Sequence, residues 1–377
     1  MMDLTTVLTP ALILDRGKLE KNCQAMLARC KQHGVRLRPH MKTLKSIDAA
    51  RIAMDPVHPA VAVATLNEAE YFASHDIADI QYAVCIAPDK LDRAAGVLRR
   101  AGSFSFFVDS PAVAQRVVTY ARKNAVRFHV WIEVDSGEHR TGLAPCDPDL
   151  IATARVLSTP DVTLRGLATH GGQSYKCRDT ECASQVAEAE RAALLAAAKS
   201  LRSHGTDVHA LSAGSTPTAV HGRSFDGLTE LRPGVYMAGD SFQESLGTVA
   251  MDRIAVTVLA TVISHNVARN HIVIDAGGLA LSKDRSTASC SKNRGYGLVL
   301  DIHGHPSFGE LLIHDVHQEH GELLISDPDL FEQLPIGSKL RIVPNHVCMT
   351  AAMYSNYLVV EGGTKILATW PRTNGWT

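Results

Sequence analysis

The sequence lacks the features that would place this protein in a membrane or on a nucleic acid. No stretch of its 377 residues approaches the roughly 18 consecutive apolar residues of a membrane-spanning helix. Its formal net charge is only -1, so no bulk positive charge attracts nucleic acid or an anionic membrane. The segment MMDLTTVLTPALILD has no basic stretch followed by an apolar core and a small-residue cleavage site, so we expect no secretory signal.

The sequence also lacks a cysteine pair of the CxxC type. Its eight cysteines are scattered, at positions 23, 30, 85, 146, 177, 182, 290 and 348. In a long chain without a secretory signal, this pattern predicts free thiols in a reducing cytoplasm. With 45% hydrophobic and 20% charged residues, the composition is that of an ordinary globular protein, long enough for two domains or for a barrel with an appendage.

Short apolar segments alternate with helical segments over the first two thirds of the chain. We expect strands around Val35 and Leu37 and at Ala11–Leu14, Val61–Thr65, Ile80–Val84, Ser105–Val108, Phe128–Val134, Leu164–Ala168, Val208–Ser212 and Gly234–Met237. The expected helices include Lys18–His33, Leu66–Ser74 and Ala183–Arg202. Near-continuous apolar strands separated by helices indicate a parallel sheet, and their number favours an α/β fold of the (β/α)8 barrel type.

The character of the sequence changes after about residue 250. Strand-like segments separated by Gly, Asn, Asp and Pro turns follow, at Ile254–Ser264, Ile272–Asp275, Leu298–Ile302, Glu322–Ile325, Lys339–Val343, Tyr357–Val360 and Lys365–Thr369. Such a series is typical of an antiparallel β domain. We therefore predict a barrel over residues 10–245 and a β domain over 246–377 together with residues 1–9.

A pair of lysines follows the strand at Val35 and Leu37, in the string RPHMKTLKS. A lysine at the end of a buried strand is costly unless its charge is paired or its pKa falls. A lysine with a lowered pKa can form a Schiff base with an aldehyde such as pyridoxal phosphate (PLP). Lys42 is nearer to the strand end than Lys45, for which a surface charge is the simpler interpretation. A solvated basic loop remains the alternative for both.

Two further barrel segments have residues suited to binding a ligand. The segment Ala213–Thr218 combines small residues with the hydroxyls of Ser215 and Thr216, which suit a phosphate group. Tyr236, after the next strand, can bind the same phosphate. The alternative for this segment is an ordinary capped helix start. In THGGQSY, His170 and Tyr175 suit an aromatic ring, although a lone histidine at a strand end is more often only a satisfied polar group.

The string PNHVC places His346 and Cys348 two residues apart. On an extended segment such residues point the same way, as two ligands of one metal must. Imidazole with thiolate favours zinc among the divalent metals, with manganese, cobalt or magnesium as alternatives. Two ligands leave positions open for water or substrate, as a catalytic metal requires, but a two-residue pattern by itself arises often by chance.

Together these strings resemble the fold-type III PLP enzymes related to D-serine dehydratase and D-threonine aldolase. The resemblance covers TPALILD, RPHMKTLKS, THGGQSY, GSTPT, PGVY, VIDAG, QEHG and PNHVC, in order along nearly the whole chain. It implies an alanine-racemase-like (β/α)8 barrel, a C-terminal antiparallel β domain and a homodimer. It places the Schiff base on Lys42, the phosphate around Ser215, Thr216 and Tyr236, and the pyridine nitrogen near Tyr175.

The resemblance also implies that His346 and Cys348 bind the divalent metal, and it favours dehydratases for D-serine and D-threo-3-hydroxyaspartate over aldolases. The expected reaction removes water from a D-β-hydroxy amino acid, with Lys42 as the base at Cα, and gives a 2-oxo acid and ammonia. Asp240 lies in a segment that is instead reminiscent of aldolases, so a retro-aldol reaction giving glycine and an aldehyde remains the alternative. A racemase or a non-catalytic PLP-binding protein fits the sequence less well.

Overall fold

The computed structural model describes residues 2–376 and divides into two compact units. The barrel unit comprises residues 24–234 and the last residues of the chain from 373. The β unit comprises the N-terminal residues to 23 and residues 235–372. The boundaries between these units therefore fall near residues 23 and 235, whereas we predicted domain boundaries near residues 10 and 245. The outer limits of the predicted domains, residues 1 and 377, lie outside the described residues.

Eight parallel strands form the sheet of the barrel unit in the order β2-β9-β8-β7-β6-β5-β4-β3. Their bounds are β2 Arg36–Leu37, β3 Val61–Val63, β4 Asp79–Cys85, β5 Ser103–Val108, β6 Phe128–Glu133, β7 Val162–Ala168, β8 Ala210–Ala213 and β9 Glu230–Leu231. A parallel bridge between His40 and Ala62 joins the continuation of β2 to β3 and closes the ring. The expected (β/α)8 barrel is confirmed.

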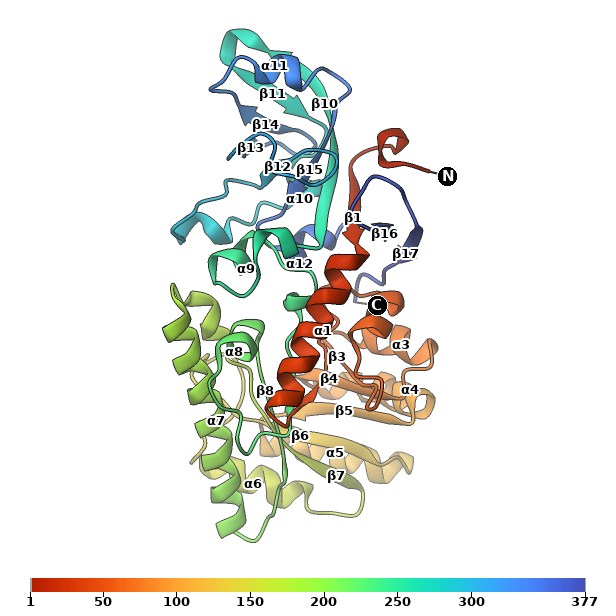
Figure 1. Ribbon diagram of the computed structural model, residues 1–377. Coiled ribbons are helices and arrows are strands. Elements are labelled where there is room, and N and C mark those ends of the chain that lie inside the picture. Colours follow the sequence, from red (N-terminus) through yellow and green to blue (C-terminus); the bar gives the residue numbers. More distant parts are fainter. Residues whose placement is uncertain (1, 377) are drawn as a thin grey trace. The chain divides into compact units, whose positions relative to one another are not determined.

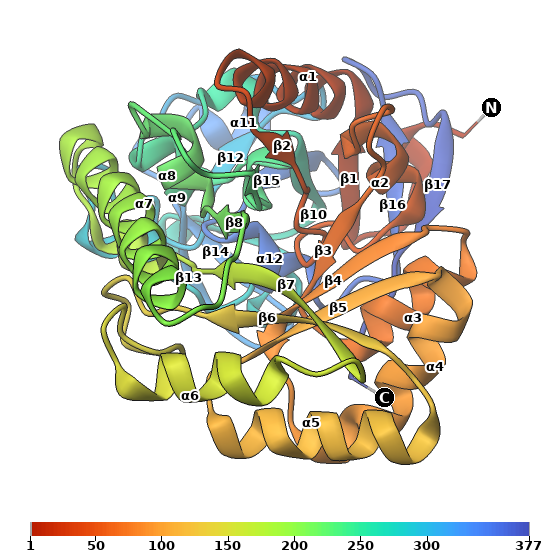
Figure 2. The same cartoon turned by 90° about the horizontal axis from the view of Figure 1, so that it is seen from below.

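Helices cover the outside of this sheet, as Figure 2 shows for α3 to α7. Their bounds are α2 Ile47–Ala53, α3 Leu66–Ser74, α4 Leu91–Ala101, α5 Pro111–Asn124, α6 Pro148–Leu157, α7 Thr180–Ser203 and α8 Thr216–His221, with 3-10 turns η2 Pro88–Lys90 and η3 Gly172–Lys176. Local signals fix several starts: Thr65 caps α3 by accepting the N–H of Glu68, and Pro111 opens α5. Helix α1 (Arg16–Gln32) crosses the boundary between the units.

The β unit contains a nine-stranded sheet through which the long strand β10 runs (Figure 1). Its strands are β1 Ala11–Asp15, β10 Val256–Asn266, β11 His271–Ile274, β12 Leu298–Leu300, β13 Ile313–Val316, β14 Gly321–Leu324, β15 Lys339–Val343, β16 Asn356–Val360 and β17 Ala368–Pro371. Its short helices are α9 Ser241–Ser245, α10 Gly278–Leu281, α11 Leu330–Gln333 and α12 Val347–Ala351, with turns η1 Leu4–Thr6, η4 Val235–Met237, η5 Met251–Arg253, η6 Val267–Arg269 and η7 Ser286–Ser289. All strand pairs except β1 with β16 are antiparallel.

Two strand predictions were wrong. Ala11–Leu14 is not a barrel strand, because it forms β1 and pairs with β10 and β16 in the β unit. The last barrel strand is Glu230–Leu231, whereas the predicted strand at Gly234–Met237 is a 3-10 turn. Both segments are apolar, as a strand prediction requires. Pairing with distant residues nevertheless decided whether each segment joined a sheet, and which sheet it joined.

Cysteine pairing also differs from the prediction. Cys177 and Cys182 form a disulfide, and six other cysteines are free thiols among the described residues. The spacing gave no signal for this bridge, because the turn that brings the two sulfur atoms together is a property of the folded loop. No helix in residues 2–376 has the length and apolar character that crossing a membrane requires.

Candidate active site

Lys42 lies just beyond β2, at the carboxyl-terminal end of the barrel strands. Its segment is fixed by backbone hydrogen bonds on both sides: the N–H of His40 donates to Pro233 and that of Met41 to Ala62. The exposed Lys42 side chain lines a cavity of about 300 Å³. The other residues of this cavity are His40, Ala64, Ala83, Val84, Cys85, Phe107, Glu133, Arg140, Thr141, His170, Gly214 and Arg232.

Lys45 is not the surface charge that we expected. Its backbone φ is 51°, and its Nζ atom lies 3.3 Å from Oε1 of the buried Glu68. The ammonium group of Lys45 thus forms an ion pair with Glu68, whereas Lys42 is the lysine that lines the cavity. Arg38 also pairs with carboxylates, donating to Glu230 at 3.0 Å and to Asp79 at 3.1 Å.

Two histidines in this cavity are held in the neutral form. Burial lowers the pKa of His170 to about 3, and the positive charges of Lys42 and Arg140 act in the same direction. Burial and the charge of Lys42 also lower the pKa of His40 well below its usual value. The cavity therefore presents imidazole rings that do not repel a cationic partner near neutral pH.

The Gly-Ser-Thr loop has the predicted position between β8 and α8, but two of its backbone donors are already used. The N–H of Gly214 donates to Glu190 at 3.1 Å, and that of Ser215 donates to Oγ1 of Thr218 at 2.9 Å in a capping box. Ser215 and Thr216 are buried. Their hydroxyl groups, more than the N–H groups of Gly214 and Ser215, remain the predicted contacts for a phosphate.

Glu190 was not singled out by the sequence, although it braces this end of the barrel. It extends from α7 and is 2% exposed. Its Oε1 atom accepts the N–H of Gly171 at 2.5 Å as well as that of Gly214. A Cβ atom on Gly171 would lie 2.8 Å from the Glu190 carboxyl carbon, so a side chain there would displace the carboxylate. Glu190 thus joins the loop after β7 to the loop after β8.

The loop after β6 places Arg140 in the cavity. The carboxylate of Asp135 accepts the N–H groups of Gly137 and His139 at 2.8 and 3.1 Å, which makes Asp135 a brace and not a ligand-facing group. Arg140 pairs with Glu138 at 3.3 Å. Arg232, the other arginine in the cavity, is buried and donates to Ser212 and to the carbonyl of Thr169. Arg140 is therefore the better placed of the two to receive an anionic ligand.

Cys85, Asp109 and Glu133 form a compact group at the ends of three neighbouring strands. Their ligand atoms lie within 4.8 Å of one another, the one set of three or more such residues found in the described part of the chain. Cys85 donates from Sγ to Oε2 of Glu133 at 3.0 Å, and burial together with the Glu133 charge raises the pKa of the thiol. Because a metal requires thiolate, we interpret this group as a hydrogen-bonded cavity wall.

The remaining predicted ligands occupy separate places. Tyr175 is half-buried on η3 in the barrel unit. Tyr236, His346 and Cys348 belong to the β unit, where Tyr236 is buried in η4. The structure thus gathers Lys42 and His170 in one cavity, and His346 and Cys348 in one segment.

His346 and Cys348 adjoin one another, but not on an extended strand as we expected. His346 caps the N-terminus of α12, and Cys348 lies in its first turn. Burial lowers the pKa of His346, but hydrogen bonds with Asp284 and Cys348 outweigh this effect and raise it to about 11. Nδ1 of His346 lies 3.2 Å from Oδ2 of Asp284, which leaves Nε2 as the ring atom for a metal.

Asp240 holds the segment with His346 and Cys348 in place. Its Oδ1 accepts the N–H of Gln243 at 2.7 Å, and its Oδ2 accepts that of Val347 at 2.9 Å. The backbone N–H of Ser241 donates to Pro344, and that of Phe242 to Asn345. Asp240 is fully buried and both of its oxygen atoms are engaged, so it is a structural cap. The feature that suggested an aldolase therefore has a structural explanation.

The fold defines a class: a barrel of the alanine racemase type joined to a largely antiparallel β domain. The family profile "Alanine racemase, N-terminal domain" matches residues 14–242, and "Putative serine dehydratase domain" matches residues 255–360. The chain belongs to the alanine-racemase-like family that includes the D-serine dehydratases.

Two relatives are similar over almost their whole lengths. The chain is 39% identical to D-threo-3-hydroxyaspartate dehydratase of Delftia sp. (strain HT23) over 380 residues, covering 99% of each. It is 31% identical to D-serine dehydratase of Dictyostelium discoideum, covering 99% of this chain and 98% of the relative. The solved structure of the Delftia enzyme matches with a TM-score of 0.93, at 38% identity and with all of both chains covered.

Proposed function

We propose that this protein is a PLP- and divalent-metal-dependent lyase that removes water from D-β-hydroxy amino acids. D-threo-3-hydroxyaspartate, D-serine and D-threonine are the candidate substrates, and a 2-oxo acid and ammonia are the products. The observation that carries this proposal is the lysine in a closed-barrel cavity, combined with a neighbouring histidine and cysteine in the β unit. The similarity to dehydratases along nearly the whole chain supports it.

The barrel cavity suits the proposed cofactor in its chemistry. Lys42 offers a primary amine in the cavity, and the glycine at position 214, with φ of 111°, keeps the neighbouring loop free of a side chain. PLP, when bound, withdraws electrons from the substrate Cα and so makes its proton acidic. We assign Lys42 as the covalent attachment point, Ser215, Thr216 and Tyr236 as phosphate contacts, and His170 and Tyr175 as ring contacts.

Each remaining step falls to a residue of the chain. Nζ of Lys42 takes the proton from the substrate Cα, as a general base. Arg140 binds a substrate carboxylate and so orients the Cα–H bond, because charge-assisted pairs of guanidinium with carboxylate fix geometry. The neutral His170 adds no further positive charge beside Lys42.

The donor set in the β unit suits a divalent metal. Imidazole and thiolate favour zinc, and two protein ligands leave open positions. A metal bound there would polarise the β-hydroxyl group and make it a better leaving group. In this assignment Nε2 of His346 and Sγ of Cys348 bind the metal, while Asp284 holds the ring orientation. We further propose that the protein is a cytoplasmic homodimer. Sedimentation of the purified protein tests the number of subunits.

The deciding experiment is an assay of the purified protein with D-serine, D-threonine and D-threo-3-hydroxyaspartate, with and without a chelator. The proposal expects 2-oxo acid and ammonia in equal amounts, loss of both on chelation, and recovery with added zinc or manganese. Formation of glycine and an aldehyde from D-threonine, without 2-oxobutanoate, would show an aldolase instead.

A further inference from the structure

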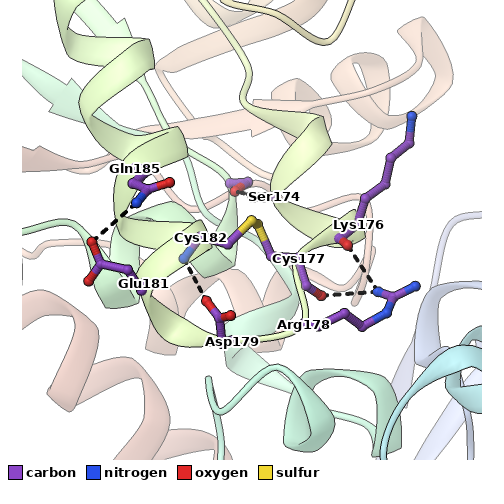
Figure 3. The surroundings of a disulfide bond; sticks show 9 residues. Ser174, Lys176, Cys177, Arg178, Asp179, Glu181, Cys182 and Gln185 are labelled. Carbon is purple, nitrogen blue, oxygen red and sulfur yellow. Dashed lines mark hydrogen bonds between the residues drawn. A yellow bond between two sulfur atoms is a disulfide. The ribbon is translucent and has the colours of Figure 1, made fainter.

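The disulfide between Cys177 and Cys182 spans the junction of η3 and α7 (Figure 3). Cys177 directly follows η3, and Cys182 lies in the first turn of α7. The cap of that helix lies between them: Asp179 accepts the N–H of Cys182 at 2.7 Å. The bridge therefore ties the end of the loop after β7 to the start of the longest helix of the barrel unit.

The loop that this bridge closes contacts the proposed phosphate site. The N–H of Cys177 donates to the carbonyl of Ser174 at 3.3 Å. The Ser174 hydroxyl lies 2.8 Å from that of Ser215, and both serines are buried. A displacement of Cys177 is thus transmitted to Ser215 through one turn of backbone and one buried hydrogen bond.

The same loop is tied to α7 at its other end. Gly171 donates its N–H to Glu190, which extends from α7 and also accepts the N–H of Gly214. Residues 171–177, which include Tyr175, are therefore fastened to one helix twice. One fastening is a buried carboxylate, and the other is the disulfide. The second is the one that a change of redox conditions can remove.

We propose that Cys177 and Cys182 form a site of reversible thiol oxidation that clamps the cofactor-binding loop. A dithiol reductant, either a small molecule or a protein, breaks the S–S bond and is oxidised to its own disulfide. The two electrons and two protons that it gives up leave two cysteine thiols on this chain. This inference rests on the proposed function in naming PLP as the ligand that the loop contacts and in placing the protein in the reducing cytoplasm.

The location favours reversibility over a permanent structural bridge. Disulfides in reducing compartments are usually transient or redox-sensing. Cys182 is half-buried and lies at the N-terminus of a helix of 24 residues, where the helix dipole stabilises a thiolate. Arg178 and Lys176 flank Cys177 with positive charge. Because Cys177 is buried, the half-buried Cys182 is the position at which a thiolate is available for exchange.

Reduction of the disulfide weakens cofactor binding, because the loop of residues 171–177 is then less ordered and the bound ligand must supply the free energy to order it. We expect the reduced protein to lose PLP about three- to ten-fold faster than the oxidised protein, the scale of a modest change in loop ordering. The test dilutes oxidised and reductant-treated holoenzyme and follows the cofactor absorbance. Alkylation and mass measurement count the thiols, with two additional labels expected after reduction.

Two variants make the test specific. The double variant Cys177→Ser, Cys182→Ser should lose PLP at the faster rate with or without reductant, which also excludes direct attack of the reductant on the cofactor. Cys146→Ser, which removes an exposed free thiol, should keep the full response. Equal rates of loss for the oxidised and reduced protein, with the labels confirming reduction, would overturn the clamp.

A readout that does not involve the cofactor separates this inference from the proposed function. Amide hydrogen exchange of residues 171–178 should accelerate on reduction, whereas β6 should not change. Faster exchange in a protein that binds no PLP would support the clamp and refute the proposed function. Unchanged exchange after confirmed reduction, or absence of the disulfide after mild oxidation, refutes the clamp.

Discussion

Nδ1 of His346 lies 3.2 Å from Oδ2 of Asp284, and in the proposed metal site this contact leaves Nε2 as the ligating ring nitrogen. The other Asp284 oxygen accepts the N–H of Ser286 at 2.7 Å, so the carboxylate is itself held in place. A carboxylate on the distal nitrogen fixes the ring orientation of a ligating histidine and raises its basicity. Asp284 is thus a positioning residue for the proposed metal site.

Replacing Asp284 by asparagine should weaken metal binding by about 10- to 100-fold, the usual effect of losing such a partner. Competition with a fluorescent zinc chelator measures the affinity. Asp252→Asn, an exposed aspartate of the same unit, is the matched control and should leave the affinity unchanged. An unchanged affinity in Asp284→Asn would show that the contact does not orient His346 for a metal.

Replacing Lys42 by alanine should remove the absorbance band of the lysine-bound cofactor and reduce turnover by about 10²- to 10⁴-fold, the usual contribution of a general base. Spectroscopy of the holoenzyme and a 2-oxo acid assay measure the two effects. Lys90→Ala is the control because Lys90 lies on η2, away from the cavity residues. Full activity of Lys42→Ala would refute its assignment.

Replacing Arg140 by alanine should reduce kcat/KM for D-threo-3-hydroxyaspartate by about 10- to 100-fold, since it removes a charged hydrogen-bond donor to the substrate. The cofactor absorbance should persist, because Lys42 is retained. Arg155→Ala, an exposed arginine on α6, is the control. Steady-state kinetics with each substrate decide the outcome, and unaltered kcat/KM in Arg140→Ala would exclude it from carboxylate binding.

Replacing Lys45 by methionine should destabilise the barrel unit without removing the cofactor band. The variant leaves the carboxylate of Glu68, which is 1% exposed, without its ion-pair partner, and removal of one member of a buried pair costs about 3 kcal/mol. Urea unfolding followed by circular dichroism measures this loss. The double variant with Glu68→Gln should recover most of the stability, and failure to do so would argue against the pair as the cause.

Replacing His170 by glutamine should reduce the pH dependence of the stability of the apoprotein. Burial holds the pKa of His170 at about 3 in the folded state, against an ordinary value of 6.5. Between pH 3 and pH 6.5, the imidazole of residue 170 therefore binds a proton in the unfolded chain but not in the folded chain. The stability of the folded protein that is present above pH 6.5 is consequently lost as the pH falls toward 3. Urea midpoints between these pH values should decrease less in the variant, and parallel curves would contradict the burial of a neutral imidazole.

The sequence revealed much of the barrel because its signals are local. The helix at Leu66–Ser74 has the predicted bounds, since Asn67 and Glu68 mark its first turn in the sequence. Lys42 was distinguishable for a similar reason: it follows the first apolar strand of the barrel, and the ends of parallel strands gather at one edge. His346 and Cys348 were close in sequence, so any compact segment was bound to keep them close in space.

The contacts missed by the sequence all join distant residues. Glu190 on α7 meets Gly214 in the loop after β8, Lys45 meets Glu68 across helix α2 and strand β3, and the disulfide depends on the path of the loop after η3. None of these positions has a composition or spacing that predicts its partner. Asp240 shows the converse, because its neighbours in sequence suggested chemistry, whereas both its oxygen atoms cap backbone groups.

By itself, then, the sequence determined the alternation of strand and helix, and it pointed to Lys42 and to the histidine–cysteine pair as candidate site residues, because apolar periodicity and short motifs record local burial and local chemistry. Only the tertiary structure decided that β1 joins the β unit, that Lys45 is paired while Lys42 faces the cavity, and that Cys177 and Cys182 form a bridge. The physical reason is that strand pairing, ion pairs and disulfides are set by distances between residues far apart along the chain or across a folded turn, and no local pattern encodes those distances.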